Sequence, residues 1–266
     1  MCAFQVGAAL AKSLLPVVGA QGTAVLRLSI AALILSLAFR TWRVRLPQRD
    51  WLQVARYGAV LGLMNLCFYF ALQRLPLGIT VALEFTGPLA VALWHSRRAL
   101  DFLWVMLAVL GLALLVPWRG AATAVDPVGV LFALGAALFW ALYIVWGRQA
   151  GKLIGTRSVA LGMVVGALVV MPFGASAAAP ALGSATLLGI AAAVAVLSSV
   201  LPYTLEMLVL TRLPARVFGV SMSLEPAVAA LVGWLILGEQ LATLQYLAIA
   251  AIMVASGGAA LSARAT

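Results

Sequence analysis

The sequence predicts an all-α membrane protein whose ten transmembrane helices form two inverted five-helix repeats, with a short first helix. Three observations lead to this prediction: an apolar composition, an internal repeat and a one-sided distribution of basic residues. Hydrophobic residues make up 65% of the 266 residues and charged residues only 9%, whereas about a quarter of a soluble domain is charged. A membrane span needs roughly 20 mainly apolar residues, so about ten spans use nearly the whole chain.

The apolar runs give the positions of the ten helices in order along the chain. We expect helices at residues 1–15, 22–39, 52–73, 77–95, 102–117, 127–147, 157–175, 183–210, 214–237 and 240–262. The connections between them are short and polar or basic. The first run stops at Pro16 and is short for a span, so either the start of the chain is truncated or this helix spans incompletely. We find no charged segment followed by a cleavage site, and we therefore expect no signal peptide.

Basic residues indicate the orientation of these helices. With the amino terminus in the cytoplasm, thirteen basic residues fall on the cytoplasmic side, and only Arg74 and Arg119 fall clearly outside. The thirteen are Arg40, Arg43, Arg45, Arg49, Arg56, Arg97, Arg98, Arg148, Lys152, Arg157, Arg212, Arg216 and Arg264. Because short cytoplasmic loops carry an excess of basic residues, we expect a multi-pass protein of the bacterial inner membrane with both termini in the cytoplasm. The same rule explains the net charge of +10, and without a basic face or an RNA-binding motif we expect no nucleic-acid partner.

An internal repeat with an offset of 138 residues relates the two halves of the chain. An Arg-Leu-Pro tripeptide recurs, and the same offset carries a proline and an acidic residue onto their equivalents without a gap. The matched positions are 74–76 with 212–214, Pro88 with Pro226, and Asp101 with Glu239. Since five spans are an odd number, the second copy must enter the membrane the other way up, as in many secondary transporters. We expect the first repeat at residues 1–117 and the second at residues 127–262.

Two glutamates lie inside apolar helices, each close to a proline. Glu84 precedes Pro88 by four residues near the middle of the fourth helix, and Glu225 directly precedes Pro226 near the middle of the ninth. The two are not repeat equivalents, since the offset carries Glu84 onto Met222. Ionisable groups are costly inside a bilayer, and proline frees a backbone carbonyl. We predict that one or both glutamates line a midplane cavity and bind a substrate ammonium or a coupling proton; the alternative is a structural role, as a protonated or hydrogen-bonded group.

Three more ionisable residues are candidates for the transport path. Glu206 lies about two turns from the membrane centre by helix counting, where it is a candidate inner gate or proton relay, or a partner of Arg212 or Arg216 at the interface. Arg27 in the second helix and Lys12 in the first are candidates to bind a substrate carboxylate or an acidic partner. The alternative for both is that the long side chain extends through lipid to water.

Uncharged polar residues on apolar helices are further candidates to line the cavity. Asn65 and Tyr69 share one face of the third helix at positions i and i+4. Tyr203 lies on the eighth helix and Trp140 on the sixth. Hydrogen bonds between helices and a place at the membrane interface are the alternatives for most of them. We favour Asn65 and Tyr203 as cavity residues.

No sequence motif indicates an enzyme. The chain contains no Walker loop, Rossmann fingerprint, zinc-ligand pair or nucleophile elbow. Its single histidine, His95, cannot form a metal site alone, and Cys2 and Cys67 lack ligand spacing. We therefore expect no catalytic residue, no metal and no cofactor, and transport driven by ions or by the gradient of the substrate, with no direct use of ATP.

Four sequence runs carry a resemblance to a known family. LGITVALEFTGPLAVAL at 77–93 and LPYTLEM at 201–207 are very similar to the threonine/homoserine exporters of enteric bacteria. EPA at 225–227, followed by LGE at 237–239, resembles the EamA repeats of the drug/metabolite transporter superfamily. The resemblance implies ten helices around a central cavity, export of threonine, homoserine and related amino acids, and a proton gradient as driving force. The chain departs from the family at its start, where fewer residues precede Gly7.

Three hypotheses for the function remain at this point. The first is a secondary transporter that exports small amino acids by alternating access, with proton coupling. The second is an exporter of another small metabolite or drug on the same fold. The third, an integral membrane enzyme or a scaffold, is less favoured because the polar residues lie near the midplane and not together at one interface. The sequence makes no prediction of oligomeric state.

Overall fold

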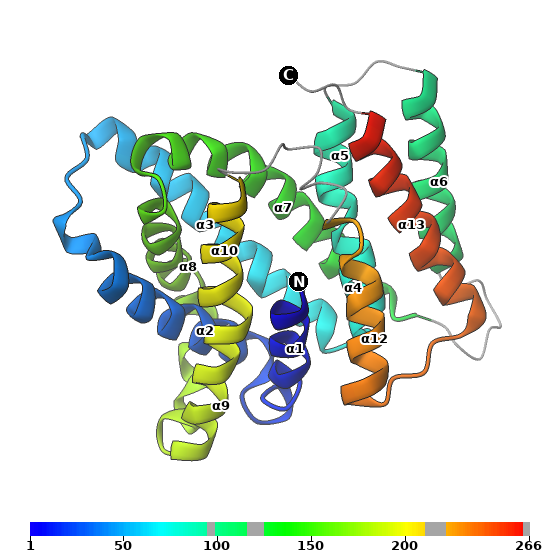
Figure 1. The fold of residues 1–266 in the computed structure, drawn as a ribbon. Coiled ribbons are helices and arrows are strands. Elements are labelled where there is room, and N and C mark those ends of the chain that lie inside the picture. Colours follow the sequence, from blue (N-terminus) through cyan, green and yellow to red (C-terminus); the bar gives the residue numbers. More distant parts are fainter. Residues whose placement is uncertain (95–98, 116–124, 211–221, 263–266) are drawn as a thin grey trace.

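The structure is a computed structural model, and it describes residues 1–94, 99–115, 125–210 and 222–262 (Figure 1). Every regular element in these four segments is helical, which confirms the predicted all-α class. The α-helices are α1 (Cys2–Ala11), α2 (Leu15–Phe39), α3 (Gln48–Leu72), α4 (Leu77–Glu84), α5 (Thr86–Trp94), α6 (Ala99–Leu115), α7 (Pro127–Ile154), α8 (Arg157–Leu182), α9 (Ala185–Ala195), α10 (Leu201–Leu210), α12 (Glu225–Leu237) and α13 (Thr243–Ser262). A 3-10 turn, η1 (Thr41–Arg43), and a π-helical turn, η2 (Val196–Val200), are the other described helical elements.

Several of these helices are suited to crossing a membrane. Six stretches are long and apolar enough, at Leu15–Phe39, Gln48–Leu72, Pro127–Ile154, Arg157–Leu182, Ala185–Glu206 and Thr243–Ser262. Shorter apolar helices lie at Cys2–Ala11, Leu77–Val91, Phe102–Leu114 and Glu225–Leu237. The chain is therefore a membrane protein with several apolar helices, whereas ten complete spans and their inverted arrangement stay predictions. His95, Arg119 and five of the basic residues used to predict orientation, at 97, 98, 212, 216 and 264, lie outside the described residues.

The boundary between the first two helices differs from the sequence-based expectation. We expected helices at 1–15 and 22–39, but α1 ends at Ala11 and α2 begins at Leu15. Pro16 lies in the first turn of α2, where its missing N–H group is tolerated, so it begins the second helix. Gly19 has a φ of 65°, a value that favours glycine, and this allows α2 to bend near its start.

Three breaks separate helical elements beside prolines. α4 gives way to α5 at Phe85, η2 separates α9 from α10, and α12 begins at Glu225. A proline lies at or just after each interruption, at Pro88, Pro202 and Pro226. Because proline has no N–H group, it leaves the carbonyl four residues earlier without its helical partner. Each interruption therefore offers polar backbone atoms inside an apolar helix, which is tolerated where the backbone is buried in protein or lines a cavity.

Close helix contacts surround these interruptions. α2 packs along α8, α3 along both α7 and α8, and α6 along α13. Glycines bring α3 and α8 together, since a Cβ atom at Gly62 would lie only 2.7 Å from the carbonyl oxygen of Gly166. In the middle of the molecule α12 contacts both α1 and α4 (Figure 1). Of these short helices, α4 and α12 carry the buried glutamates Glu84 and Glu225.

Candidate binding cavity and ion-pair cluster

A cavity of about 310 Å³ lies between α1, α3, α4, α7, α10 and α12. Its lining residues are Met1, Ala3, Phe4, Met64, Val81, Glu84, Trp140, Tyr143, Pro202, Tyr203, Leu205, Glu206, Met222 and Glu225. The structure thus brings together five residues that the sequence singled out: Glu84, Glu206, Glu225, Tyr203 and Trp140. The lining combines three glutamates with aromatic and aliphatic side chains, the composition of a site for a small polar molecule with an apolar part.

The helix interruptions position two of the glutamates. Glu84 is the last residue of α4, and Glu225 is the first residue of α12. Their exposed fractions are 6% and 5%, so both carboxyl groups are shielded from bulk water. Free N–H groups at a helix amino terminus favour negative charge, which supports a carboxylate at Glu225.

The side chain of Gln5 binds Glu225 and was missed by the sequence reasoning. The Gln5 amide nitrogen donates to Glu225 Oε1 over 3.1 Å. Glu225 Oε2 and Gln5 Oε1 are both buried, and neither has a hydrogen-bond partner among the residues that the structure describes. A buried acceptor without a donor costs roughly 1–3 kcal/mol. Glu225, which lines the cavity, therefore suits a ligand that brings an N–H group.

Aromatic side chains form much of the remaining wall. The rings of Tyr143 and Tyr203 are 6.0 Å apart in an edge-on arrangement, and Trp140 meets Phe85 edge-on at 5.3 Å. The hydroxyl groups of Tyr57 and Tyr143 are 3.4 Å apart and hydrogen-bonded. Such rings provide a rigid apolar surface with polar tips. They hold the shape of the cavity between α7 and α10.

Arg27 is buried beside the cavity and does not extend to water. Only 1% of it is exposed. Its guanidinium donates to Ser199 Oγ over 2.8 Å, to the Ser198 carbonyl oxygen over 2.6 Å and to the Tyr69 hydroxyl over 3.2 Å. The Ser198 carbonyl is the one that Pro202, four residues later, cannot bind. Arg27 thus stabilises the interrupted helix, and no carboxylate forms an ion pair with it within the described ranges.

Three of the predicted site residues do not line the cavity: Arg27, Tyr69 and Asn65. The ring of Phe4, which does line it, lies 5.2 Å from the Arg27 guanidinium, so Arg27 is behind this ring. Tyr69 is fully buried against Arg27. Asn65 donates to the Leu61 carbonyl oxygen of its own helix over 2.8 Å. These residues support the wall from behind.

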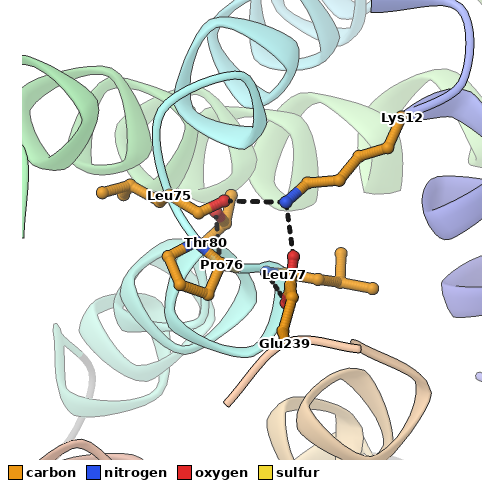
Figure 2. Close-up of polar contacts among 6 residues, drawn as sticks. All are labelled: Lys12, Leu75, Pro76, Leu77, Thr80 and Glu239. Atoms are coloured by element: carbon orange, nitrogen blue, oxygen red, sulfur yellow. Dashed lines mark hydrogen bonds and ion pairs between the residues drawn. The ribbon is translucent and has the colours of Figure 1, made fainter. Parts of the chain in front are cut away.

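Lys12 lies outside the cavity in a separate polar cluster (Figure 2). Its ammonium group forms an ion pair with Glu239 Oε1 and donates to the Leu75 carbonyl oxygen over 3.3 Å. The other carboxylate oxygen of Glu239 accepts a hydrogen bond from the Leu77 backbone N–H over 2.8 Å. Lys12 therefore has an acidic partner, which was one of the three possibilities that the sequence left open. Among the described residues no group of histidine, cysteine and acidic side chains is suited to hold a metal ion.

Comparison with known proteins adds the family to this geometry. The model of the EamA-like transporter family matches residues 127–260. The chain is also 50% identical over 264 residues to the threonine/homoserine exporter RhtA of Escherichia coli (strain K12), covering 99% of this chain and 90% of that protein. The chain belongs to the EamA-like transporter family. RhtA of Salmonella typhimurium (strain LT2) is 51% identical to this EamA-like transporter, with the same coverage.

A solved crystal structure shares the fold of this EamA-like transporter. The two chains superimpose with a TM-score of 0.60 at 19% sequence identity, over 98% of this chain and 97% of the other. At this identity the likeness shows the fold alone. The family and the relatives named as exporters make the protein a membrane transporter, as the composition and the buried glutamates predicted.

Proposed function

We propose that the protein exports threonine, homoserine and related small amino acids across the bacterial inner membrane by alternating access, coupled to the proton gradient. The observation that carries the proposal is the cavity with Glu84, Glu206 and Glu225 in its wall, in a chain 50% identical to an exporter of that name. A volume of about 310 Å³ is at the small end of ligand sites, which span about 300–1,000 Å³. A small amino acid suits such a volume.

Glu225 is the proposed site for the substrate ammonium group. Its Oε2 atom is free to accept, while the Gln5 amide holds Oε1. An ammonium group has three N–H donors and one positive charge, so it satisfies a buried carboxylate better than a neutral donor does. Gln5 fixes the direction of the carboxylate and is a positioning residue in this arrangement.

Arg27 is the proposed electrostatic counterpart for the substrate carboxylate. Its guanidinium lies 5.2 Å from the ring of Phe4, and this ring lines the cavity. Electrostatic attraction is stronger in an apolar surrounding than in water, so the charge of Arg27 acts through this wall. A zwitterion is then oriented with its ammonium towards Glu225 and its carboxylate towards the side of Arg27.

Glu84 and Glu206 are the proposed carriers of the coupling proton. Both line the cavity without belonging to an ion pair among the described residues. A buried carboxyl group that exchanges its proton only when substrate is absent links the flux of protons to the flux of substrate. This assignment leaves Glu225 to the substrate and gives each glutamate a separate task.

The proposed architecture has ten spans in two inverted repeats, at residues 1–117 and 127–262, with both termini in the cytoplasm. Within the described residues, six longer and four shorter apolar helices support this count. The family match at residues 127–260 coincides with the proposed second repeat.

Efflux of labelled threonine and homoserine from loaded cells tests the function. Cells that contain the protein should export both faster than cells without it, and collapse of the proton gradient should abolish the difference. Equal efflux with and without the protein would contradict the proposed substrates and favour another metabolite on the same fold.

Two variants test the site. Glu84→Gln and Glu225→Gln should each reduce export at least tenfold in correctly inserted protein. Asp50→Asn is the matched control, because Asp50 is an acidic residue in the first turn of α3 and does not line the cavity. Wild-type rates in both glutamate variants would remove the proposed role of the cavity.

A further inference from the structure

The ion-pair cluster around Lys12 joins three segments that are far apart in the sequence. Lys12 directly follows α1, Leu75 and Leu77 lie at the connection between α3 and α4, and Glu239 lies just after α12. Figure 2 shows the Lys12 ammonium between the Leu75 carbonyl oxygen and the Glu239 carboxylate, with Leu77 on the other side of that carboxylate. In the proposed architecture the first two segments belong to one repeat and Glu239 belongs to the other.

Glu239 caps the amino terminus of α4 across this boundary. The first N–H groups of a helix have no partner within the helix, and negative charge is favoured next to them. Glu239 supplies both an acceptor, 2.8 Å from the Leu77 nitrogen, and the charge. Lys12 then compensates that charge, so the three groups form one unit, which we call the Lys12–Glu239 latch.

The local backbone is shaped for this contact. Gly238 adopts a φ of 65° and ends α12, and the N–H of Glu239 turns back to the Gly233 carbonyl oxygen over 3.0 Å. A Cβ atom at Gly233 would lie 2.5 Å from Glu239 Oε2, so the absence of a side chain there leaves room for the carboxylate. Side-chain exposures of 24% for Lys12 and 14% for Glu239 leave both groups partly accessible to water, which lowers the cost of separating them.

The latch and the cavity lie at opposite ends of the same three helices. Phe4, Glu84 and Glu225 line the cavity at one end of α1, α4 and α12. At 1.5 Å per residue, the amino terminus of α4 lies roughly 10 Å from Glu84, and the carboxy terminus of α12 roughly 18 Å from Glu225. α12 contacts both α1 and α4, so a substrate moving from the cavity towards the latch must separate α12 from them.

We propose that the Lys12–Glu239 latch is the gate that closes one face of the membrane and must open in each transport cycle. This inference rests on the proposed function for its role in export. The proposed topology places the latch at the outer face. A gate of this kind needs a contact that is specific yet reversible, and a partly hydrated ion pair on a helix terminus meets both requirements.

Reversible cross-linking tests the gate. Lys12→Cys and Glu239→Cys are combined in a protein whose own cysteines are replaced by Cys2→Ser and Cys67→Ala, and a bifunctional methanethiosulfonate reagent joins the new thiols. Export should fall at least tenfold after cross-linking and return after reduction. Each single-cysteine variant, treated in the same way, should keep the rate it had before treatment.

A second measurement needs neither cross-linking nor export. Met64→Cys places a thiol in the cavity wall, and a membrane-impermeant thiol reagent is added to the outer face. Lys12→Met should raise the labelling rate at least threefold, because the closed state loses its central charge. Glu239→Gln should act in the same direction, since the amide keeps an acceptor for Leu77 but not the charge.

The outcomes separate this inference from the proposed function. Unchanged export after cross-linking, or equal labelling rates with and without Lys12→Met, would show a static helix cap and overturn the gate. If the wild-type protein does not export threonine or homoserine, the proposed substrates fail, and the labelling rates still decide whether the latch opens.

Discussion

Replacing Gly87 with alanine should force α5 away from α7. A Cβ atom at Gly87 would lie 2.0 Å from the carbonyl oxygen of Ala137 and 2.8 Å from its carbonyl carbon. These are backbone atoms, so no side-chain rotation relieves the clash. Ordinary contacts between heavy atoms are about 3.5 Å, and the helices must therefore separate by roughly 1.5 Å. Overpacking of this kind costs about 1–3 kcal/mol, occasionally more.

The same change should weaken substrate binding. Gly87 lies between Glu84 and Pro88, and α7 carries Trp140, which meets Phe85 edge-on at 5.3 Å. Separating the two helices moves Trp140 away from the glutamate side of the cavity. We expect a lower melting temperature for the purified protein and a several-fold rise in the substrate concentration for half-maximal export.

Gly189→Ala is the matched control, because Gly189 lies in α9 and a Cβ atom there has no neighbour within 4 Å. Alanine is favoured over glycine in a helix by up to about 1 kcal/mol, so this variant should be as stable as the wild type or slightly more stable. The measurements are thermal unfolding in detergent and export in cells, made on both variants side by side. Equal melting temperatures for Gly87→Ala and Gly189→Ala would refute the close approach of α5 to α7.

Three further predictions concern hydrogen bonds. Arg27→Leu should reduce the amount of folded protein in the membrane, measured by quantitative blotting, because it removes three buried hydrogen bonds. Arg27→Lys should retain part of that folded protein, and equal amounts of both variants would contradict this prediction. Gln5→Leu should raise the threonine concentration for half-maximal export several-fold. Inhibition by the deaminated analogue of threonine, 3-hydroxybutanoate, should stay unchanged, because in the proposed site only the ammonium group binds Glu225. A parallel change for both ligands would point to a structural role of Gln5. The Asp126 carboxylate caps α7 by accepting a hydrogen bond from the Val128 N–H over 2.8 Å. Asp126→Ala should therefore lower the free energy of unfolding by about 1 kcal/mol, and Asp126→Asn should show no such loss in thermal unfolding.

The cavity glutamates were predictable because their signal is local. A carboxyl group inside an apolar run is costly wherever its neighbours lie, and a proline four residues on, or next to it, indicates an interrupted helix. Both signals are read from single positions, and Glu84 and Glu225 carry both. The structure accordingly places both of them, with Glu206, on one cavity.

The partners of these charges were not predictable, because they depend on contacts between distant segments. Gln5 binds a residue 220 positions away, and Lys12 pairs with a residue 227 positions away. No periodicity in the sequence relates such positions. The end of the first helix was misplaced for a different reason: Pro16 was taken as the stop of an apolar run at residues 1–15, whereas it lies in the first turn of α2.

The internal repeat in the sequence is compatible with a cavity that binds an asymmetric substrate, as proposed above. The offset of 138 residues carries Glu84 onto Met222, and both residues line the cavity. Pro88 and Pro226 are also equivalent. Pro88 lies four residues after Glu84 and Pro226 four residues after Met222, so the carbonyl groups of Glu84 and Met222 both lack the N–H group that normally follows in a helix. The backbone of the site therefore follows the repeat, while the charged side chains do not: the second half carries its glutamate three residues later, at the start of α12. A zwitterion has one cationic and one anionic end, and we therefore expect a pair of helices that are equivalent in backbone but unequal in charge to bind it in one direction only.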